Sequence, residues 1–360
     1  METSESPDYF YYHENFTFNI SYDDYPSLCE KSDVRSFASL FLPIVYLLCL
    51  ILGLAGNTLV IAVYMYYKRL KTMTDVFLTH LAAADLLLLS TLPFWALDAA
   101  RGWILGEALC KMVSFCYILN FSCCMQLLAC ISIDRFCALT KMEGGDNFRC
   151  FQRFFNRKNC WKVCIVIWMS AFLIGLLDLI VSQVRMSGNL TFCMPVYSSS
   201  SSRATMEMFE VILGFIIPLL IIVVCYCKVG FILGKLPTQS KSKRWEAIYV
   251  LLIIVAVFVL TQLPYNLLKV YRTLDAVYNI VTHCETSKAM DRASLVTKCL
   301  ALTHCCINPL LYTFVGSSFR RHLVKAAKRL GENNRSRRQR AEEMSFDSQS
   351  ESQQTNSFSI

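Results

Sequence analysis

Seven long apolar blocks constrain this chain more than any other feature of its sequence. Each holds 18 or more residues with few charges, which is long enough for a helix to cross a bilayer, and they lie at about residues 38–66, 76–98, 110–139, 161–183, 207–234, 246–271 and 292–316. Lipid offers backbone groups no hydrogen-bond partner, so such blocks must form helices. A soluble parallel sheet is disfavoured, because its strands would give apolar runs of about 4–8 residues. The sequence therefore predicts an all-α membrane protein, a bundle of seven spanning helices.

The charges between the blocks predict which ends of the helices face the cytoplasm. Lysine and arginine gather after the first, third, fifth and seventh blocks, as at Lys68 and Arg69 or at Arg320 and Arg321. Short basic loops stay on the cytoplasmic side, which puts the N-terminus outside and the C-terminus inside. These loops also suit the anionic lipids of the inner leaflet, so membrane lipids are expected partners and nucleic acid is not. The acidic, polar start lacks the pattern of a cleaved signal peptide, so the first block is expected to serve as an uncleaved insertion signal.

The chain divides into four segments on composition. We expect an extracellular tail at 1–37, the helix bundle at 38–316, an amphipathic helix on the inner leaflet at 317–330 and a disordered tail at 331–360. The first tail is acidic and carries five interleaved tyrosines, Tyr9, Tyr11, Tyr12, Tyr22 and Tyr25. It is either a solvating tail or a flexible binding segment for a basic protein, because acidic charge speeds encounter with cationic partners. Sequons at Asn15, Asn19 and Asn189 predict glycosylation on the outer side.

The cysteines separate by the side of the membrane on which they fall. Most of the 18 lie in the apolar blocks, where they are expected to be small buried side chains. Four fall on the oxidising side: Cys29, Cys110, Cys193 and Cys284. Four cysteines predict two disulfides with three possible pairings. No CxxC pair with metal spacing and no HExxH or GxSxG motif is present, so neither a metal, a cofactor nor an enzyme activity is expected.

One polar feature in each block forms an ordered set: Asn57, Asp85, Asp134 with Arg135, Trp168, Pro218, Pro264, and Asn308-Pro309-Leu-Leu-Tyr312. This set, over about 38–330, resembles the rhodopsin-like seven-helix receptors. TLPFW at 91–95, QLPYN at 262–266 and HCCINP at 304–309 resemble the chemokine receptors, and the wider phrases resemble their atypical, scavenging members. The resemblance implies CC chemokines as ligands, the pairs Cys110–Cys193 and Cys29–Cys284, and no enzyme activity.

The resemblance also implies where a ligand binds. The tail tyrosines and an outer cavity lined by Trp95, Asp98, Tyr117, Asp178, Glu210 and Lys298 are the expected contacts. Lys298 stands where chemokine receptors usually carry a glutamate, so it is expected to pair with Glu210 or Asp98. The alternative for Asp178 is a surface charge at the end of its span.

The same resemblance assigns a switch and coupling set: Asn57, Asp85, Asn120, Asp134, Arg135, Phe136, Gln262, Pro264, Asn308, Pro309 and Tyr312. Asp85 with its asparagines resembles a sodium pocket, but Cys124 replaces the usual serine and is a poorer ligand for a hard cation, so no metal is expected. Phe136-Cys137 and Gln262 depart from the residues usual in G-protein coupling and predict weak or absent signalling. A conventional G-protein-coupled receptor is the alternative, and a transporter or channel is disfavoured because paired broken spans are missing.

The C-terminal tail suggests the intracellular partner. Serines and a threonine alternate with acidic residues at Ser345, Ser348, Ser350, Ser352, Thr355 and Ser357. Phosphorylation would make a dense anionic strip for a basic groove, and the resemblance implies arrestin, internalisation and cycling between plasma membrane and endosomes. Phe358-Ser359-Ile360 is a weaker candidate for a PDZ domain.

Overall fold

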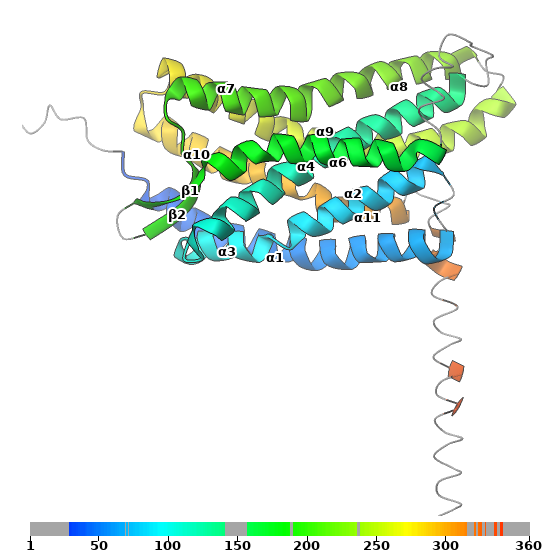
Figure 1. Cartoon of the computed structure of the whole chain (residues 1–360), viewed down its shortest axis with the longest axis horizontal. Helices are drawn as coiled ribbons and strands as arrows, with labels where there is room; N and C mark the ends of the chain where they lie inside the picture. Colours follow the sequence, from blue (N-terminus) through cyan, green and yellow to red (C-terminus); the bar gives the residue numbers. More distant parts are fainter. Residues whose placement is uncertain are drawn as a thin grey trace, which may run out of the picture.

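The computed structural model describes residues 29–68, 70, 72–140, 157–187, 190–235 and 238–314, with a few helical residues between 320 and 340. Within these residues seven helical segments are long and apolar enough to cross a membrane. They are Ser32–Tyr66, Met73–Arg101, Gly106–Thr140, Cys160–Val181, Ser200–Lys235, Ile248–Tyr278 and Cys284–Leu311, here called spans 1 to 7. They run alongside one another as a bundle (Figure 1), so the predicted all-α seven-helix fold is confirmed.

Several spans consist of more than one helical element. Span 1 joins α1 (Ser32–Ala62) to a π-helical end (Val63–Lys68), span 2 joins α2 (Met73–Leu89) to α3 (Leu92–Arg101), and span 3 is α4 (Gly106–Thr140). Span 4 is α6 (Cys160–Val181), preceded by a short 3-10 turn (Arg157–Asn159), and span 5 joins α7 (Ser200–Val211), a π-helical turn (Ile212–Ile216) and α8 (Ile217–Lys235). Span 6 belongs to α9 (Thr238–Tyr278), and span 7 joins α10 (Cys284–Leu302) to α11 (His304–Phe314).

A small antiparallel sheet marks one end of the bundle, at the left of Figure 1. It pairs β1 (Ser182–Ser187) with β2 (Leu190–Pro195), with Val184 opposite Cys193. Cys193 is bonded to Cys110 at the start of α4, and Cys29 is bonded to Cys284 at the start of α10. These are the two pairings that the resemblance implies. We call this end the outer end.

Breaks in spans 2 and 5 lie next to a proline, which removes a backbone donor, whereas α9 continues through Pro264. The sequence predicts a kink before Pro93, and α2 ends there at Leu89, with the Thr91 hydroxyl donating to the Leu88 carbonyl at 2.7 Å. In span 5 the π-helical turn lies directly before Pro218. In α9, which contains Pro264, the side chain of Asn266 donates to the Gln262 carbonyl at 2.9 Å.

The outer ends of the helices run further than hydropathy predicts. Span 7 begins at Cys284 instead of near residue 292, and span 1 begins at Ser32 instead of near 38. Polar turns in these extensions are joined by ion pairs, with Arg292 2.5 Å from Asp33 and Lys31 2.7 Å from Asp291. A helix that continues beyond the lipid needs no apolar surface, so an apolar-run criterion misses it.

Span 3 is the centre of the bundle, and most of its apolar stretch is buried. Its side chains join the largest apolar cluster, which also draws on spans 1, 2, 4, 5 and 6. Spans 1 and 7 approach closely at Gly56, where an added Cβ would lie 2.7 Å from the Cβ of Pro309. A larger residue would push these spans apart, because the facing atom belongs to a rigid ring.

We therefore expect Gly56→Ala to lower the stability of the bundle by about 1–3 kcal/mol through overpacking. The matched control is Gly230→Ala in α8, where an added Cβ meets nothing within 4 Å. That change should leave the melting temperature equal or slightly higher, since alanine favours helix by about 0.5–1 kcal/mol over glycine. The check is a pair of thermal melts on purified receptor, and equal melting temperatures for the two variants would contradict the close packing.

Candidate functional site

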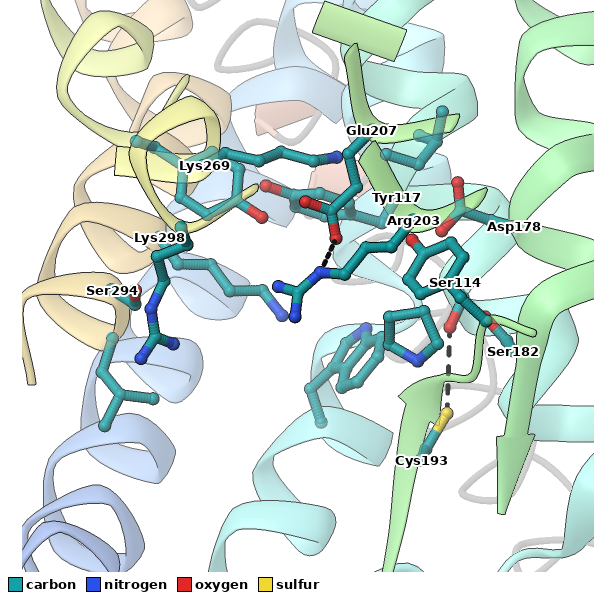
Figure 2. A pocket seen from close by; sticks show the side chains of 17 residues that line it. Ser114, Tyr117, Asp178, Ser182, Cys193, Arg203, Glu207, Lys269, Ser294 and Lys298 are labelled. Carbon is teal, nitrogen blue, oxygen red and sulfur yellow. Dashed lines mark hydrogen bonds and ion pairs between the residues drawn. The ribbon is translucent and has the colours of Figure 1, made fainter. Parts of the chain in front are cut away.

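A cavity of about 280 Å³ opens between the spans near the outer end. Of the residues that the sequence places there, Trp95, Tyr117, Asp178 and Lys298 line it. The β2 strand closes one side through Cys193, whose sulfur lies 3.8 Å from the Ser114 hydroxyl (Figure 2). The disulfide from Cys193 to span 3 therefore also positions the cavity wall.

Glu210 lies deeper than the main cavity and carries its own counter-ion. Its carboxylate is 2.5 Å from the Lys269 ammonium of span 6, and the Glu210 side chain is only 5% exposed. Glu210 and Lys269 both line a smaller pocket below the cavity. The expected pairing of Lys298 with Glu210 is therefore wrong, because Lys269 occupies that place.

Lys298 is held by aromatic rings. Its ammonium lies 4.6 Å from the ring centre of Trp95 and 5.4 Å from that of Tyr117. Such contacts stabilise a cation by about 0.5–2 kcal/mol, depending on how much water is excluded. Lys298 also acts on Asp98 electrostatically. Asp98 itself is not among the residues that line the cavity; its carboxylate interacts with the backbone of Cys193.

Asp178 lies in the cavity wall opposite Lys298 (Figure 2). Its carboxylate is next to that of Glu210, and its Oδ2 atom is buried and accepts no hydrogen bond from the described residues. A buried, unpaired acceptor is costly by about 1–3 kcal/mol until a donor reaches it. The alternative of a plain surface charge does not describe this side chain, which lines the cavity, contacts Glu210 and keeps one buried oxygen without a donor from the described residues.

Sequence reasoning missed a second set of charges in the cavity: Arg203, Glu207, Lys269 and Arg272. Glu207 is buried, accepts from the Arg203 guanidinium at 3.0 Å, and is also bound by the Thr273 hydroxyl. The missed signal was available, since a charge inside an apolar block is by default functional. Outside the spans, burial and the carboxylates of Glu207 and Glu210 raise the pKa of Tyr197, another lining residue, so its phenol stays neutral.

The inner end of span 3 holds the predicted charge pair. Arg135 lies 3.0 Å from Asp134, and both side chains also bind the hydroxyl of Thr74 in span 2. Phe136 is buried in an apolar cluster with Cys225 and Val229 of span 5. This end of span 3 is therefore tied to span 2 by polar contacts and to span 5 by apolar packing.

Asp85 is fully buried at mid-bundle and collects polar groups from two other spans. Asn120 donates to its Oδ1 at 3.2 Å and Asn308 to its Oδ2 at 3.1 Å. His304 places its Nε2 atom 3.4 Å from Asp85 Oδ1. The sequence had singled out His304 only as the first residue of the HCCINP motif. The other predicted amide of this region, Asn57, donates instead to the Cys305 carbonyl at 2.7 Å.

Gln262 joins spans 6 and 7 close to this group. Its amide donates to the Ala301 carbonyl at 2.9 Å, and the whole residue is 2% exposed. The ring of His304 also packs edge-on against Phe258, with centroids 4.8 Å apart. At this depth the Gln262 amide, which also lies 3.2 Å from His304 Nδ1, and the Phe258–His304 contact tie span 6 to span 7, and Arg272 of span 6 pairs with Asp291 of span 7 nearer the outer end.

Some predicted residues lie outside the part of the chain that the structure describes. These are the tail tyrosines, the three sequon asparagines, the C-terminal serines and threonine, and Phe358-Ser359-Ile360. For Tyr312 the backbone is helical and the side chain is not described.

The chain is similar to known seven-helix receptors. A family model described as "7 transmembrane receptor (rhodopsin family)" matches residues 56–312. The chain is 42% identical to atypical chemokine receptor 4 of Homo sapiens over 360 residues, covering all of this chain and 99% of the relative. It is 40% identical over 332 residues to C-C chemokine receptor type 9 of Homo sapiens (91% of this chain, 85% of the relative). It is 38% identical over 315 residues to C-C chemokine receptor type 7 of Homo sapiens (87% and 81%).

The Glu210–Lys269 pair leads to a prediction about stability. Lys269→Met should lower the free energy of unfolding by about 3–5 kcal/mol, because it leaves a buried carboxylate without its cation. Adding Glu210→Gln should recover a large part of that loss. The matched control, Lys111→Met, removes a lysine from the more exposed pair with Glu107 and should change stability by no more than about 1 kcal/mol.

Thermal melts of the purified variants give the measurement. If the single variant Lys269→Met melts together with Lys111→Met, the buried pair does not hold spans 5 and 6 as described.

Proposed function

The chain belongs to the rhodopsin family of seven-transmembrane receptors and to its chemokine-receptor branch, and from that premise we propose that it binds CC chemokines outside the cell and internalises them. As a receptor of this family it is a multi-pass plasma-membrane protein. The proposal separates into how the ligand is bound and what happens after binding.

Charge supports a basic protein ligand at the outer face. Residues 1–37 carry eight acidic residues and two basic ones, Lys31 and Arg35, together with the tyrosines named above. Such a segment raises the encounter rate of a cationic partner. The tail is tied at Cys29 to the start of span 7, and later residues of that span, Ser294, Leu295 and Lys298, line the cavity.

Inside the cavity the unpaired oxygen of Asp178 supports one binding position for the ligand's basic N-terminus. Asp178 offers a buried oxygen without a partner among the described residues, and Glu207 adds a second carboxylate close by. Lys298 lies on the opposite side, where it repels an ammonium group (Figure 2). A ligand that enters here therefore binds with its ammonium toward spans 4 and 5 and away from span 7.

The observation that carries the scavenging part is Gln262. It stands where most members of the branch carry a tryptophan, and its hydrogen bond to the Ala301 carbonyl ties span 6 to span 7. A hydrogen bond buried between two spans opposes movement of span 6 relative to span 7, so we expect it to disfavour the rearrangement that coupling to a G protein requires. Phe136-Cys137, another departure from the branch, lies where a G protein would contact span 3, and Phe136 is already buried against span 5.

Internalisation without G-protein signalling requires another cytoplasmic partner, and we propose arrestin. The phosphorylatable residues from Ser345 to Ser357 supply the anionic strip, and capture by arrestin leads to endosomes. A conventional G-protein-coupled chemokine receptor is the second candidate, favoured by the intact Asp134–Arg135 pair and by the similarity to C-C chemokine receptors.

The deciding prediction concerns ligand uptake and G-protein activation, measured together. Cells that express the chain receive a labelled panel of CC chemokines, and ligand uptake and G-protein activation are measured in the same wells. We expect uptake of at least one ligand with no G-protein activation above that of untransfected cells. A signalling receptor of the branch provides the positive control. Robust activation would replace the scavenger with the conventional receptor, and no uptake of any ligand would refute internalisation of CC chemokines.

A second prediction tests the tail. Asp23→Asn with Asp24→Asn should slow chemokine association several-fold at low salt and much less at high salt, because salt screens the attraction. The dissociation rate should change less. Glu342→Gln with Glu343→Gln removes the same charge from the cytoplasmic tail and serves as the control. An association rate that does not differ from the control at low salt would sink the electrostatic role of the tail.

A further inference from the structure

Lys298 is a cation of the outer cavity that has no carboxylate partner among the described residues. The other three cations that line the cavity each form an ion pair: Lys269 with Glu210, Arg203 with Glu207, and Arg272 with Asp291. Asp98 acts on Lys298 electrostatically but forms no ion pair with it, and the Asp98 carboxylate interacts with the backbone of Cys193. One positive charge of the cavity is therefore left for a group that enters from outside.

Aromatic rings hold the Lys298 ammonium without satisfying its hydrogen-bond donors. The ammonium lies 4.6 Å from the ring centre of Trp95 and 5.4 Å from that of Tyr117. A ring attracts a cation through its electron cloud, whereas an ammonium also carries three N–H donors that need acceptors. Among the described residues no oxygen accepts from Lys298, whose side chain lines the cavity. Water or a ligand must therefore satisfy these donors.

A ligand in the cavity displaces the water that can bind this ammonium. The cavity holds about 280 Å³, near the lower end of the roughly 300–1,000 Å³ of small-molecule sites, so it admits only the first residues of a protein ligand. A segment that fills this space without an acceptor leaves a desolvated cation, which is costly. A carboxylate instead forms a short, charge-assisted hydrogen bond with the ammonium.

The two unpaired groups of the cavity lie on opposite walls. Asp178 of span 4 keeps a buried oxygen without a donor from the described residues, and Lys298 of span 7 lies across the cavity from it (Figure 2). A ligand with a terminal ammonium and a nearby carboxylate can bind both groups at once. The same segment bound in the opposite direction would place like charges together on both walls, which is unfavourable. The charges therefore select both the composition and the direction of the inserted segment.

We propose that Lys298 binds a carboxylate from the N-terminal segment of the protein ligand, so that the receptor prefers CC chemokines with an aspartate or glutamate in that segment. The inference rests on the proposed binding of CC chemokines and adds the chemistry by which the receptor distinguishes among them. It is independent of which cytoplasmic partner then binds the receptor.

The first test changes the ligand and leaves the full-length receptor intact. One labelled CC chemokine that the receptor takes up is made without acidic residues in its N-terminal segment, and then with a single Asp, Asn or Lys at each position of that segment in turn. At one position or more, we expect the Asp form to bind roughly ten-fold more tightly than the Asn form, and the Lys form to bind more weakly than both. Equal affinities of the Asp and Asn forms at every position would overturn the inference.

The second test changes Lys298. Lys298→Met should remove the difference in affinity between the Asp and Asn forms, Lys298→Arg should keep it, and Lys298→Glu should favour the Lys form. The matched control is Lys288→Met, which removes a lysine of the same helix that pairs with Glu285 and does not line the cavity. The control should leave the ratio of the two affinities unchanged.

The outcomes separate this inference from the proposed function. If Lys298→Met weakens the Asp and Asn forms equally, Lys298 does not bind a carboxylate, and chemokine binding itself still stands. If no CC chemokine binds to the unmodified receptor, the proposed function fails and the inference fails with it. If Lys298→Met does not reach the cell surface, the ligand series on the unmodified receptor gives the answer.

Discussion

Water is absent from the middle of a bilayer, so each polar group inside the spans of this protein needs a partner from the protein itself. Backbone groups meet this need by forming helices, which accounts for the helical form of every span. Several side chains meet it in pairs and small groups that join different spans: Glu210 with Lys269, Arg135 with Thr74, and Asp85 with Asn120 and Asn308. Apolar packing brings the spans together, and these polar groups fix which faces meet.

The outer cavity shows the same rule where water begins to enter. Four cations and two carboxylates line it, and several of them pair with each other or with aromatic rings. Among the carboxylates that line it, Asp178 has an oxygen without a hydrogen-bond donor from the described residues. Such a site selects a ligand by the position of its positive charge rather than by its total charge.

Features that depend on neighbouring residues in the chain could be predicted from the sequence, and features that depend on contacts between distant residues could not. The spans follow from local composition and could be predicted, and the kink before Pro93 follows from one missing donor. The helix ends could not, because ion pairs such as Asp33 with Arg292 join residues that are far apart in the chain. For the same reason Glu210 was wrong as one of the two partners expected for Lys298, since a sequence does not reveal that Lys269 pairs with Glu210. His304 was visible in its motif, but its position beside Asp85 depends on how span 7 is rotated.

The π-helical turn Ile212–Ile216 gives span 5 a property of another kind. Such a turn holds one residue more than an α-helix of the same length, and a residue corresponds to about 100° of helical rotation. Loss of a single codon in this stretch could restore a plain helix without shortening either half. Glu207 would then turn away from the cavity, and Glu210 from the smaller pocket, while α8 kept its packing against span 3. One small deletion could thus exchange the face that α7 presents to the cavity for another face, a route by which ligand preference can change in one evolutionary step.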